Sequence, residues 1–125
     1  MEPFQGKIIA VTGAASGMGR ASATNLSKKG AILSLADRDR AGLEHTVSLL
    51  EGTHRDKTII NVFDVASTSE VCAWITDTVP RLGPLDGAAN VAGVYQEKSI
   101  LECDEDEWDF TMDINAKGIF NCARG

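Results

Sequence analysis

Glycines and other small residues form one short stretch that can bind a phosphate group, the octet TGAASGMG from Thr12 to Gly19. Gly13 allows a tight turn out of a preceding strand, Gly17 lets the backbone approach a bound anion, and Gly19 lets a following helix pack closely on the sheet. The first N–H groups of that helix and the positive end of its dipole then face the anion. The octet therefore predicts a pyrophosphate site, and a glycine turn without a ligand is the alternative.

An acidic residue follows the octet at the spacing that dinucleotide-binding folds use for a ribose contact, because Asp37 closes the next apolar segment. A carboxylate there accepts hydrogen bonds from the ribose hydroxyls of adenosine and repels a 2′-phosphate, so we predict NAD rather than NADP. Arg38 and Arg40 come directly afterwards. An arginine at this place can pair with a 2′-phosphate, and the alternative, which we favour, is that both face solvent.

Strand and helix patterns alternate four times along the chain and must position these residues. The predicted strands, short and apolar as strands covered on both faces should be, are residues 7–11, 31–36, 58–63 and 85–91. The predicted helices run from Gly17 to Lys29, through Leu43 to Gly52, from the capping box Ser67-x-x-Glu70 to an end formed by Pro80, Gly83 and Pro84, and from Asp104, with Glu107 three residues on, through Ile119. This alternation predicts one α/β domain, residues 1–125, with a parallel sheet and right-handed crossovers.

The octet has one residue more between its first two glycines than the general dinucleotide-binding fingerprint. With that spacing, the chain resembles the short-chain dehydrogenase/reductase family. The other matching segments are Asp37, Asp64-Val65, Asn90-Val91-Ala92-Gly93 and Asn115 in the segment NAKGIF. The resemblance covers the chain from Lys7 to its last residue. It implies the N-terminal half of a Rossmann-like, doubly wound parallel sheet, with strand order 3-2-1-4 and helices on both faces.

The resemblance assigns the adenosine and pyrophosphate contacts to residues at the ends of the first three strands. The backbone of the octet would hold the pyrophosphate, with Ser16 and Met18 nearest the cofactor. Asp64 and Val65 would bracket the adenine ring, the carboxylate reaching the exocyclic amine and the apolar side chain lining the slot. The alternative for Asp64 is that it caps the helix that follows.

The contacts on the nicotinamide side are assigned to the end of the fourth strand. Asn90, Ala92 and Gly93 would touch the ribose there, and Val91 replaces the second asparagine of the family's Asn-Asn-Ala-Gly pattern, which weakens any polar role at that position. Asn115 resembles the family's structural and catalytic asparagine, whose backbone holds a water in a proton relay. An asparagine in the middle of a helix is also compatible with a packing role alone.

Catalysis in this family requires a tyrosine, a lysine four residues later and a serine, which members carry in a second half of the chain. The only tyrosine here, Tyr95, lies in a loop, and Lys98 follows it three residues on, with Ser99 in the place of the lysine. We therefore predict that the catalytic triad is absent from this chain and that the isolated chain is inactive. His45 and His54 are predicted to be solvated surface residues. The two hypotheses are an oxidoreductase acting on an alcohol or carbonyl substrate, and an inactive nucleotide-binding or partner-binding module.

The composition of the chain argues against several classes of binding partner. A net charge of −6 without a basic cluster argues against nucleic acid. The acidic residues 102–107 predict a solvated helix start, with a metal site as the alternative, and we predict no metal. Three widely spaced cysteines favour neither a disulfide framework nor a zinc site. With no predicted signal peptide or membrane segment, we expect a reducing, cytoplasmic location.

Two surfaces of the predicted fold lack cover. The fourth strand has no neighbour on its outer side, and such an edge invites pairing with another chain. The last predicted helix is apolar on two faces, with Trp108 and Met112 on one and Phe110 and Phe120 on the other. One face can pack on the sheet while the other needs a partner. We therefore predict self-association or association with a full-length homologue.

Overall fold

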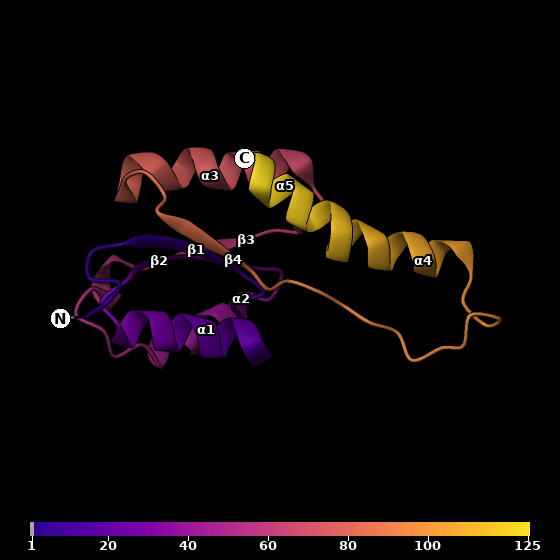
Figure 1. The fold of residues 1–125 in the computed structure, drawn as a ribbon, viewed down its shortest axis with the longest axis horizontal. Coiled ribbons are helices and arrows are strands. Elements are labelled where there is room, and N and C mark those ends of the chain that lie inside the picture. The colour runs from indigo at the N-terminus through magenta and orange to yellow at the C-terminus, as the bar shows by residue number, and fades with distance from the viewer. Residues whose placement is uncertain (1) are drawn as a thin grey trace.

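The computed structural model describes residues 2–125 and places four parallel strands in one sheet, in the order β3-β2-β1-β4. The strands are β1 Ile8–Thr12, β2 Ile32–Asp37, β3 Ile59–Val62 and β4 Gly87–Asn90. Helices lie on both faces of the sheet (Figure 1). The α/β class, the parallel sheet and the strand order expected from the sequence are confirmed.

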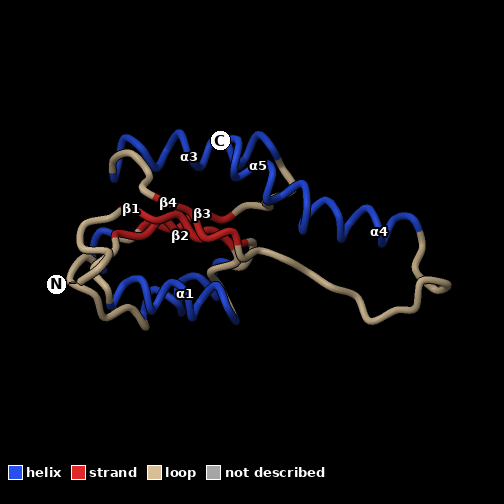
Figure 2. Tube along the Cα trace, viewed as in Figure 1, coloured by secondary structure: helices blue, strands red, loops and turns tan. Residues whose placement is uncertain are grey.

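Two layers of helices enclose the sheet. Figure 2 shows α1 on one side of the strands and α3 and α5 on the other, while α4 extends away from the sheet beside a long loop that leaves β4. The helices are α1 Gly17–Lys28, α2 Arg40–Ser48, α3 Thr68–Leu82, α4 Glu105–Met112 and α5 Gly118–Arg124, with a π-helical turn, Asp113–Lys117, between the last two and a 3-10 turn, Arg55–Lys57, before β3.

The register of the sheet sorts side chains into one apolar cluster on each face. Val11 pairs with Leu35 on one side and with Ala89 on the other, and all three contribute to the cluster under α1 and α2. Because side chains alternate along a strand, the neighbouring Ala10 and Ala36 face the opposite cluster, which includes Phe63, Val71, Trp74 and Ile114. Burial on both faces explains why the strand sequences are almost continuously apolar.

The buried polar side chains between α3 and the sheet are paired with one another. The indole nitrogen of Trp74 donates to the hydroxyl of Ser34 at 2.7 Å, and that hydroxyl shares a further hydrogen bond with Thr78 at 2.9 Å. Ser34 and Thr78 are fully buried. A buried hydroxyl without a partner is costly, so these bonds fix how α3 lies on the sheet.

Two of the expected helices, α3 and the last one, have features that the sequence did not locate. Of the three residues expected to end α3, Pro80 lies inside it and the helix closes at Gly83, whose φ is +110° and whose N–H donates to the carbonyl of Val79 at 2.9 Å. A proline in the last turn removes only one intrahelical bond, so the helix can continue past it. The last expected helix is interrupted by the π-helical turn, which no residue pattern had indicated.

The predicted capping box of α3 and the start of α4 also differ from each other. Asp104 accepts from the amide of Glu107 at 2.8 Å, and the Glu107 carboxylate accepts from the amide of Asp104 at 3.0 Å, so the box at the start of α4 is complete. Ser67 caps α3 by accepting from the amide of Glu70 at 3.4 Å. The Glu70 carboxylate instead lies 3.5 Å from the amide of Asp64, so only half of that box forms.

Candidate functional site

The carboxyl ends of all four strands border one cleft of about 310 Å³. Every residue predicted to contact the cofactor lines it except Asn90, which is the last residue of β4 and pairs with Thr12 in the sheet. Parallel strands bring their carboxyl ends to one edge of a sheet, which explains why segments far apart in sequence meet here. Four further residues line the cleft that the sequence had not indicated as contacts: Phe63, Val91, Val94 and Ile114.

The glycine octet forms the turn between β1 and α1. Gly13 has a φ of +67°, and a Cβ added to it would lie 2.8 Å from the backbone nitrogen of Ala92, so this turn touches the segment after β4. A Cβ added to Gly19 would lie 1.9 Å from the carbonyl oxygen of Gly13. No larger residue fits there without moving the backbone. These two glycines allow the helix, the turn and the fourth strand to meet.

The N-terminus of α1 differs from those of α2, α3 and α4. In the described chain, residues 2–125, Ser16 is the N-cap of α1 but no side chain accepts a hydrogen bond from the first amides of this helix. Asp39, Ser67 and Asp104 cap α2, α3 and α4 respectively. The unpaired amides of α1 open into the cleft, where Ser16, Gly17 and Met18 are exposed. Such a helix start binds anions.

The end of β2 is tied to this turn. Asp37 accepts hydrogen bonds from the amide of Ala15 and from the amide of Asp39, both at 3.1 Å. A carboxylate has about four acceptor positions, so the two bonds leave capacity for a ligand hydroxyl. The side chains of Arg38 and Arg40 are 61% and 65% exposed. Arg38 borders the cleft with its Nε 3.9 Å from the carboxylate of Asp64.

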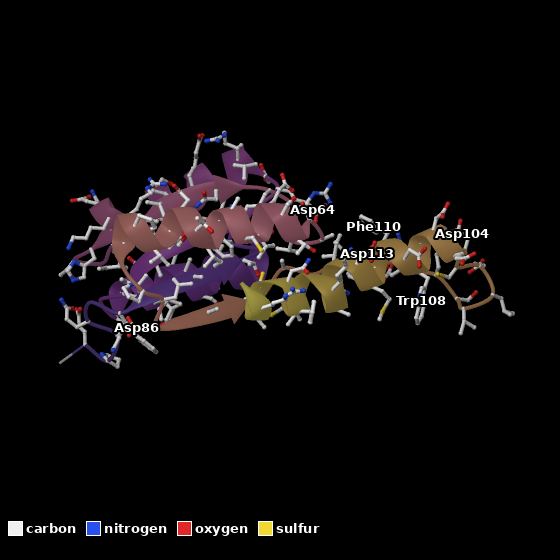
Figure 3. All side chains as sticks on the ribbon, turned by 90° about the horizontal axis from the view of Figure 1, so that it is seen from above. Asp64, Asp86, Asp104, Trp108, Phe110 and Asp113 are labelled. Atoms are coloured by element: carbon white, nitrogen blue, oxygen red, sulfur yellow. The ribbon has the colours of Figure 1, made fainter. Side chains whose placement is uncertain are left out.

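The segment after β3 forms the next wall of the cleft. Asp64 accepts from the amide of Ala66 at 2.9 Å and so stabilises its own turn, while α3 is capped by Ser67. The alternative in which Asp64 caps α3 is therefore wrong. Val65 is buried, and its carbonyl accepts from the side-chain amide of Asn121 at 3.0 Å, which links this wall to α5. Figure 3 shows Asp64 at the end of the sheet that borders the cleft, with Asp86 at the opposite end.

The segment after β4, residues 91–94, is held by two side chains that come from other elements. The hydroxyl of Thr12 accepts from the amides of Val91 and Ala92, at 3.1 and 3.2 Å. The side chain of Asn115 accepts from the amide of Val94 at 2.8 Å and donates to its carbonyl at 2.6 Å. Asn115 does not line the cleft, whereas its neighbour Ile114 does. Asn115 lies in the π-helical turn, a feature often found at functional sites.

Comparison with known proteins identifies the family. The family model described as short chain dehydrogenase matches residues 7–125. The chain belongs to the short-chain dehydrogenase/reductase family. It is 43% identical over 124 residues to the short-chain dehydrogenase/reductase aba4 of Botryotinia fuckeliana (strain B05.10), a match that covers 96% of this chain and 48% of the relative. It is 38% identical over 123 residues to the 2,3-dihydro-2,3-dihydroxybenzoate dehydrogenase of Bacillus subtilis (strain 168), covering 97% and 46%.

Solved structures of short-chain dehydrogenases/reductases share the fold. The glucose/ribitol dehydrogenase family member from Brucella melitensis superposes with a TM-score of 0.89 at 30% identity, covering 97% of this chain and 49% of that one. The L-sorbose reductase from Gluconobacter frateurii, complexed with NADPH and L-sorbose, gives a TM-score of 0.87 at 26% identity, covering 99% and 47%. The chain spans about half the length of the relatives it matches.

The candidate acid–base residues of this short-chain dehydrogenase/reductase chain lie away from the cleft. The side chain of Tyr95 is 79% exposed. Lys98 is paired with Glu107, and this hydrogen bond raises the pKa of Lys98 and lowers the pKa of Glu107. His45 is exposed, and His54 is half-buried in a hydrogen bond with Gln5. Neither histidine borders the cleft.

The described residues, 2–125, contain neither a metal-binding cluster of side chains nor a helix that could span a membrane. Within residues 2–125, no three or more histidine, cysteine or carboxylate side chains form a group suited to a metal ion. In the same range, no helix combines the length and the apolar character that crossing a membrane requires. The acidic residues 102–107 instead contain the capping box of α4 and the Ser99–Glu102 hydrogen bonds.

Proposed function

We propose that the cleft binds NAD and that this chain forms the nucleotide-binding half of an oxidoreductase acting on an alcohol or carbonyl. The observation that carries the proposal is the uncapped N-terminus of α1, which opens into a cleft bordered by the other strand ends. When bound, NAD would supply a nicotinamide ring that accepts or donates a hydride. The protein's contribution is to hold and orient the dinucleotide.

Different residues of the cleft would contact different parts of the dinucleotide. The amides at the start of α1 would hold the pyrophosphate, and Asp37 would accept from the adenosine ribose. The apolar side chain of Val65 and the carboxylate of Asp64 would form the adenine slot. Asn90, Ala92 and Gly93 would lie on the nicotinamide side, where Val91 and Val94 add apolar lining.

Cofactor choice rests on charge at the end of β2. The Asp37 carboxylate would repel a 2′-phosphate, and the Nε of the next residue, Arg38, lies 3.9 Å from the Asp64 carboxylate. The NADPH complex of the related L-sorbose reductase means that family membership alone does not select the cofactor. NAD is therefore favoured over NADP because of residues in this chain.

Isothermal titration calorimetry tests the proposal directly. We expect NAD to bind more tightly than NADP. Absence of binding by both dinucleotides would exclude the proposed function, and equal affinities would exclude the role of Asp37. The test of Asp37 is the variant Asp37→Ala. Its matched control is Asp56→Ala, because the Asp56 carboxylate is 92% exposed and lies in the 3-10 turn before β3. The control variant Asp56→Ala should bind both dinucleotides as the unmodified chain does.

A second candidate is a module that binds a nucleotide or a partner without catalysis. The exposed position of Tyr95 and the pairing of Lys98 with Glu107 favour it for residues 1–125 produced alone. General acid–base catalysis commonly contributes about 10²–10⁴ in rate, and among the described residues no tyrosine, lysine or histidine lines the cleft. We expect no NADH oxidation above background with a panel of ketones and quinones.

Turnover in that assay would be informative. If Tyr95→Phe abolished it, Tyr95 would be catalytic after all, whereas turnover that survived the change would indicate a partner chain or another base. The cytoplasmic location and association with a full-length homologue stay predictions from the sequence.

A further inference from the structure

A small polar cluster joins α1, α2 and the turn between β1 and α1. The Arg20 guanidinium donates to three oxygens: the carbonyl of Ala15, the carbonyl of Gly42 at 3.3 Å and the hydroxyl of Thr46 at 3.0 Å. The Thr46 hydroxyl is 2.7 Å from the carbonyl oxygen of Ala14. The carbonyl oxygen of Gly42 lies farther from this hydroxyl, at 3.1 Å. Since a hydroxyl has one proton and accepts from Arg20 here, its proton is given to the nearer carbonyl, that of Ala14.

The cluster is shielded from solvent, so each bond matters to the backbone. Thr46 and Ala14 are fully buried and Ala15 is almost so. A buried carbonyl that loses its donor retains the full cost of leaving water. Gly42 lets α2 touch the turn directly, because a Cβ added there would lie 2.8 Å from the carbonyl oxygen of Ala15. The turn is therefore held from outside the cleft.

The bonded carbonyls immediately precede the amides that open into the cleft. The carbonyl of Ala15 belongs to the same peptide plane as the amide of Ser16, and Asp37 holds the amide of Ala15 at 3.1 Å. Fixing these planes fixes the direction in which the following N–H groups point. Donors that are already oriented bind an anion without an ordering cost at the moment of binding.

We propose that Arg20 and Thr46 are positioning residues that set the affinity of the cleft for the pyrophosphate of a dinucleotide. This rests on the proposed function. Neither side chain lines the cleft, and the Arg20 guanidinium is committed to protein oxygens rather than to a phosphate. Both act through the orientation of residues 14–16. Through α2 they also join the pyrophosphate site to Asp39, the residue that caps α2 beside Asp37.

Two substitutions and two matched controls test this. Arg20→Met and Thr46→Val remove the polar atoms while keeping much of the side-chain volume. Arg55→Met and Thr24→Val are the controls: Arg55 donates to the carbonyl of Leu50 at 3.4 Å, and Thr24 donates to the carbonyl of Ala21 at 3.0 Å, both away from the cleft. NAD affinity is measured by calorimetry well below each variant's unfolding midpoint, so that the folded fraction does not differ.

We expect Arg20→Met and Thr46→Val to bind NAD about tenfold more weakly, equivalent to about 1.4 kcal/mol, and the controls to bind unchanged. Hydrogen exchange followed by mass spectrometry should show faster exchange in peptides covering residues 13–17 and no change in peptides from α3. A merely structural role would lower the unfolding midpoint while leaving NAD affinity and this local exchange at the values of the unmodified chain. That result would overturn the proposal.

A conservative pair keeps the test decisive if a first variant does not fold. Arg20→Lys retains the charge but places one ammonium where three directed N–H bonds are needed, so NAD affinity should fall. Thr46→Ser keeps the hydroxyl and should bind NAD as the unmodified chain does. Unchanged affinity in Arg20→Lys, or a loss in Thr46→Ser equal to that in Thr46→Val, would contradict the inference. Failure of the unmodified chain to bind NAD or NADP would instead exclude the proposed function itself.

Discussion

The carboxylate of Asp37, at the end of β2, accepts a hydrogen bond from the backbone amide of Ala15 at 3.1 Å. The residue expected to contact the adenosine ribose therefore also holds the turn that is expected to hold the pyrophosphate. One side chain connects the two halves of the adenosine diphosphate site. A substitution at Asp37 consequently changes both the ligand contact and the shape of the turn.

Asp37→Ala should weaken NAD binding and narrow the preference for NAD over NADP. The preference narrows because the charge that repels a 2′-phosphate is gone, and NAD affinity falls because hydrogen bonds to a charged group contribute about 1.5–3 kcal/mol each. Calorimetric titration with both dinucleotides measures the two effects. Asp37→Asn separates them, since it removes the charge but keeps an oxygen that can accept from Ala15. An unaltered NAD-to-NADP ratio in both variants would contradict the assignment.

Gly19→Ala should destabilise the fold by about 1–3 kcal/mol or more, the range for overpacking a tight contact. The added methyl would lie 1.9 Å from the carbonyl oxygen of Gly13, and that backbone atom cannot move without opening the turn. Gly87→Ala is the control, because its methyl would meet only the end of the Ile9 side chain at 3.3 Å. Urea unfolding measures both. Equal unfolding midpoints would show that the close approach of α1 to the turn is not required.

Asn115→Ala should loosen the loop after β4. The Asn115 side chain makes two hydrogen bonds with the backbone of Val94, and a typical hydrogen bond contributes about 1 kcal/mol net. We expect faster amide exchange at Val94 and a modest fall in the free energy of unfolding. Asn25→Ala, an exposed position on α1, is the control. If exchange at Val94 did not change, Asn115 would not be holding this loop.

Stability should depend on pH through Asp86, at the opposite end of the sheet from the cleft (Figure 3). Hydrogen bonds from the amide of Ile8 and from Lys7, both at 2.9 Å, lower the pKa of Asp86. Its stabilising contribution is therefore complete above the unfolded-state pKa of about 3.9 and is lost as pH falls through the lower folded-state value. Below about pH 4, Asp86→Asn should lose less stability than the unmodified chain.

Urea unfolding at pH 7, 4 and 3 measures that difference. Asp56→Asn provides the comparison, because its carboxylate is 92% exposed. Parallel losses of stability in the unmodified chain and in Asp86→Asn would mean that Asp86 does not contribute to acid sensitivity.

Self-association should occur at micromolar concentration. In the described part of the chain β4 is an outer strand with one neighbour, and Trp108 and Phe120 are 60% and 58% exposed. Figure 3 shows Trp108 on the part of α4 that extends beyond the sheet. Trp108→Glu and Phe120→Glu should shift the sedimentation coefficient toward that of a monomer, whereas Leu49→Glu, an exposed leucine after α2, should not. A sharp monomer in the unmodified chain would refute the prediction.

The sequence by itself determined the fold class, the strand order through the family resemblance, and most of the residues that border the cleft, with Phe63, Val91, Val94 and Ile114 as the exceptions. These conclusions were possible because they rest on local properties. Apolar periodicity defines a strand or a helix, and a parallel sheet places every strand's carboxyl end at one edge. The glycines of the octet determine the turn between the strand before it and the helix after it. Asp37, Asp64 and Ala92 could therefore be placed at the cleft from their positions after strands.

Only the tertiary structure decided how those residues are held. Arg20 meets Thr46, and Asn115 meets Val94, across elements whose relative positions no local pattern records. The π-helical turn that carries Asn115 and the continuation of α3 past Pro80 are likewise settled by packing rather than by propensity. Hydrogen bonds between distant segments depend on register and on how closely helices approach the sheet, to within fractions of an ångström. Such distances are set by the whole core, so no single stretch of sequence encodes them.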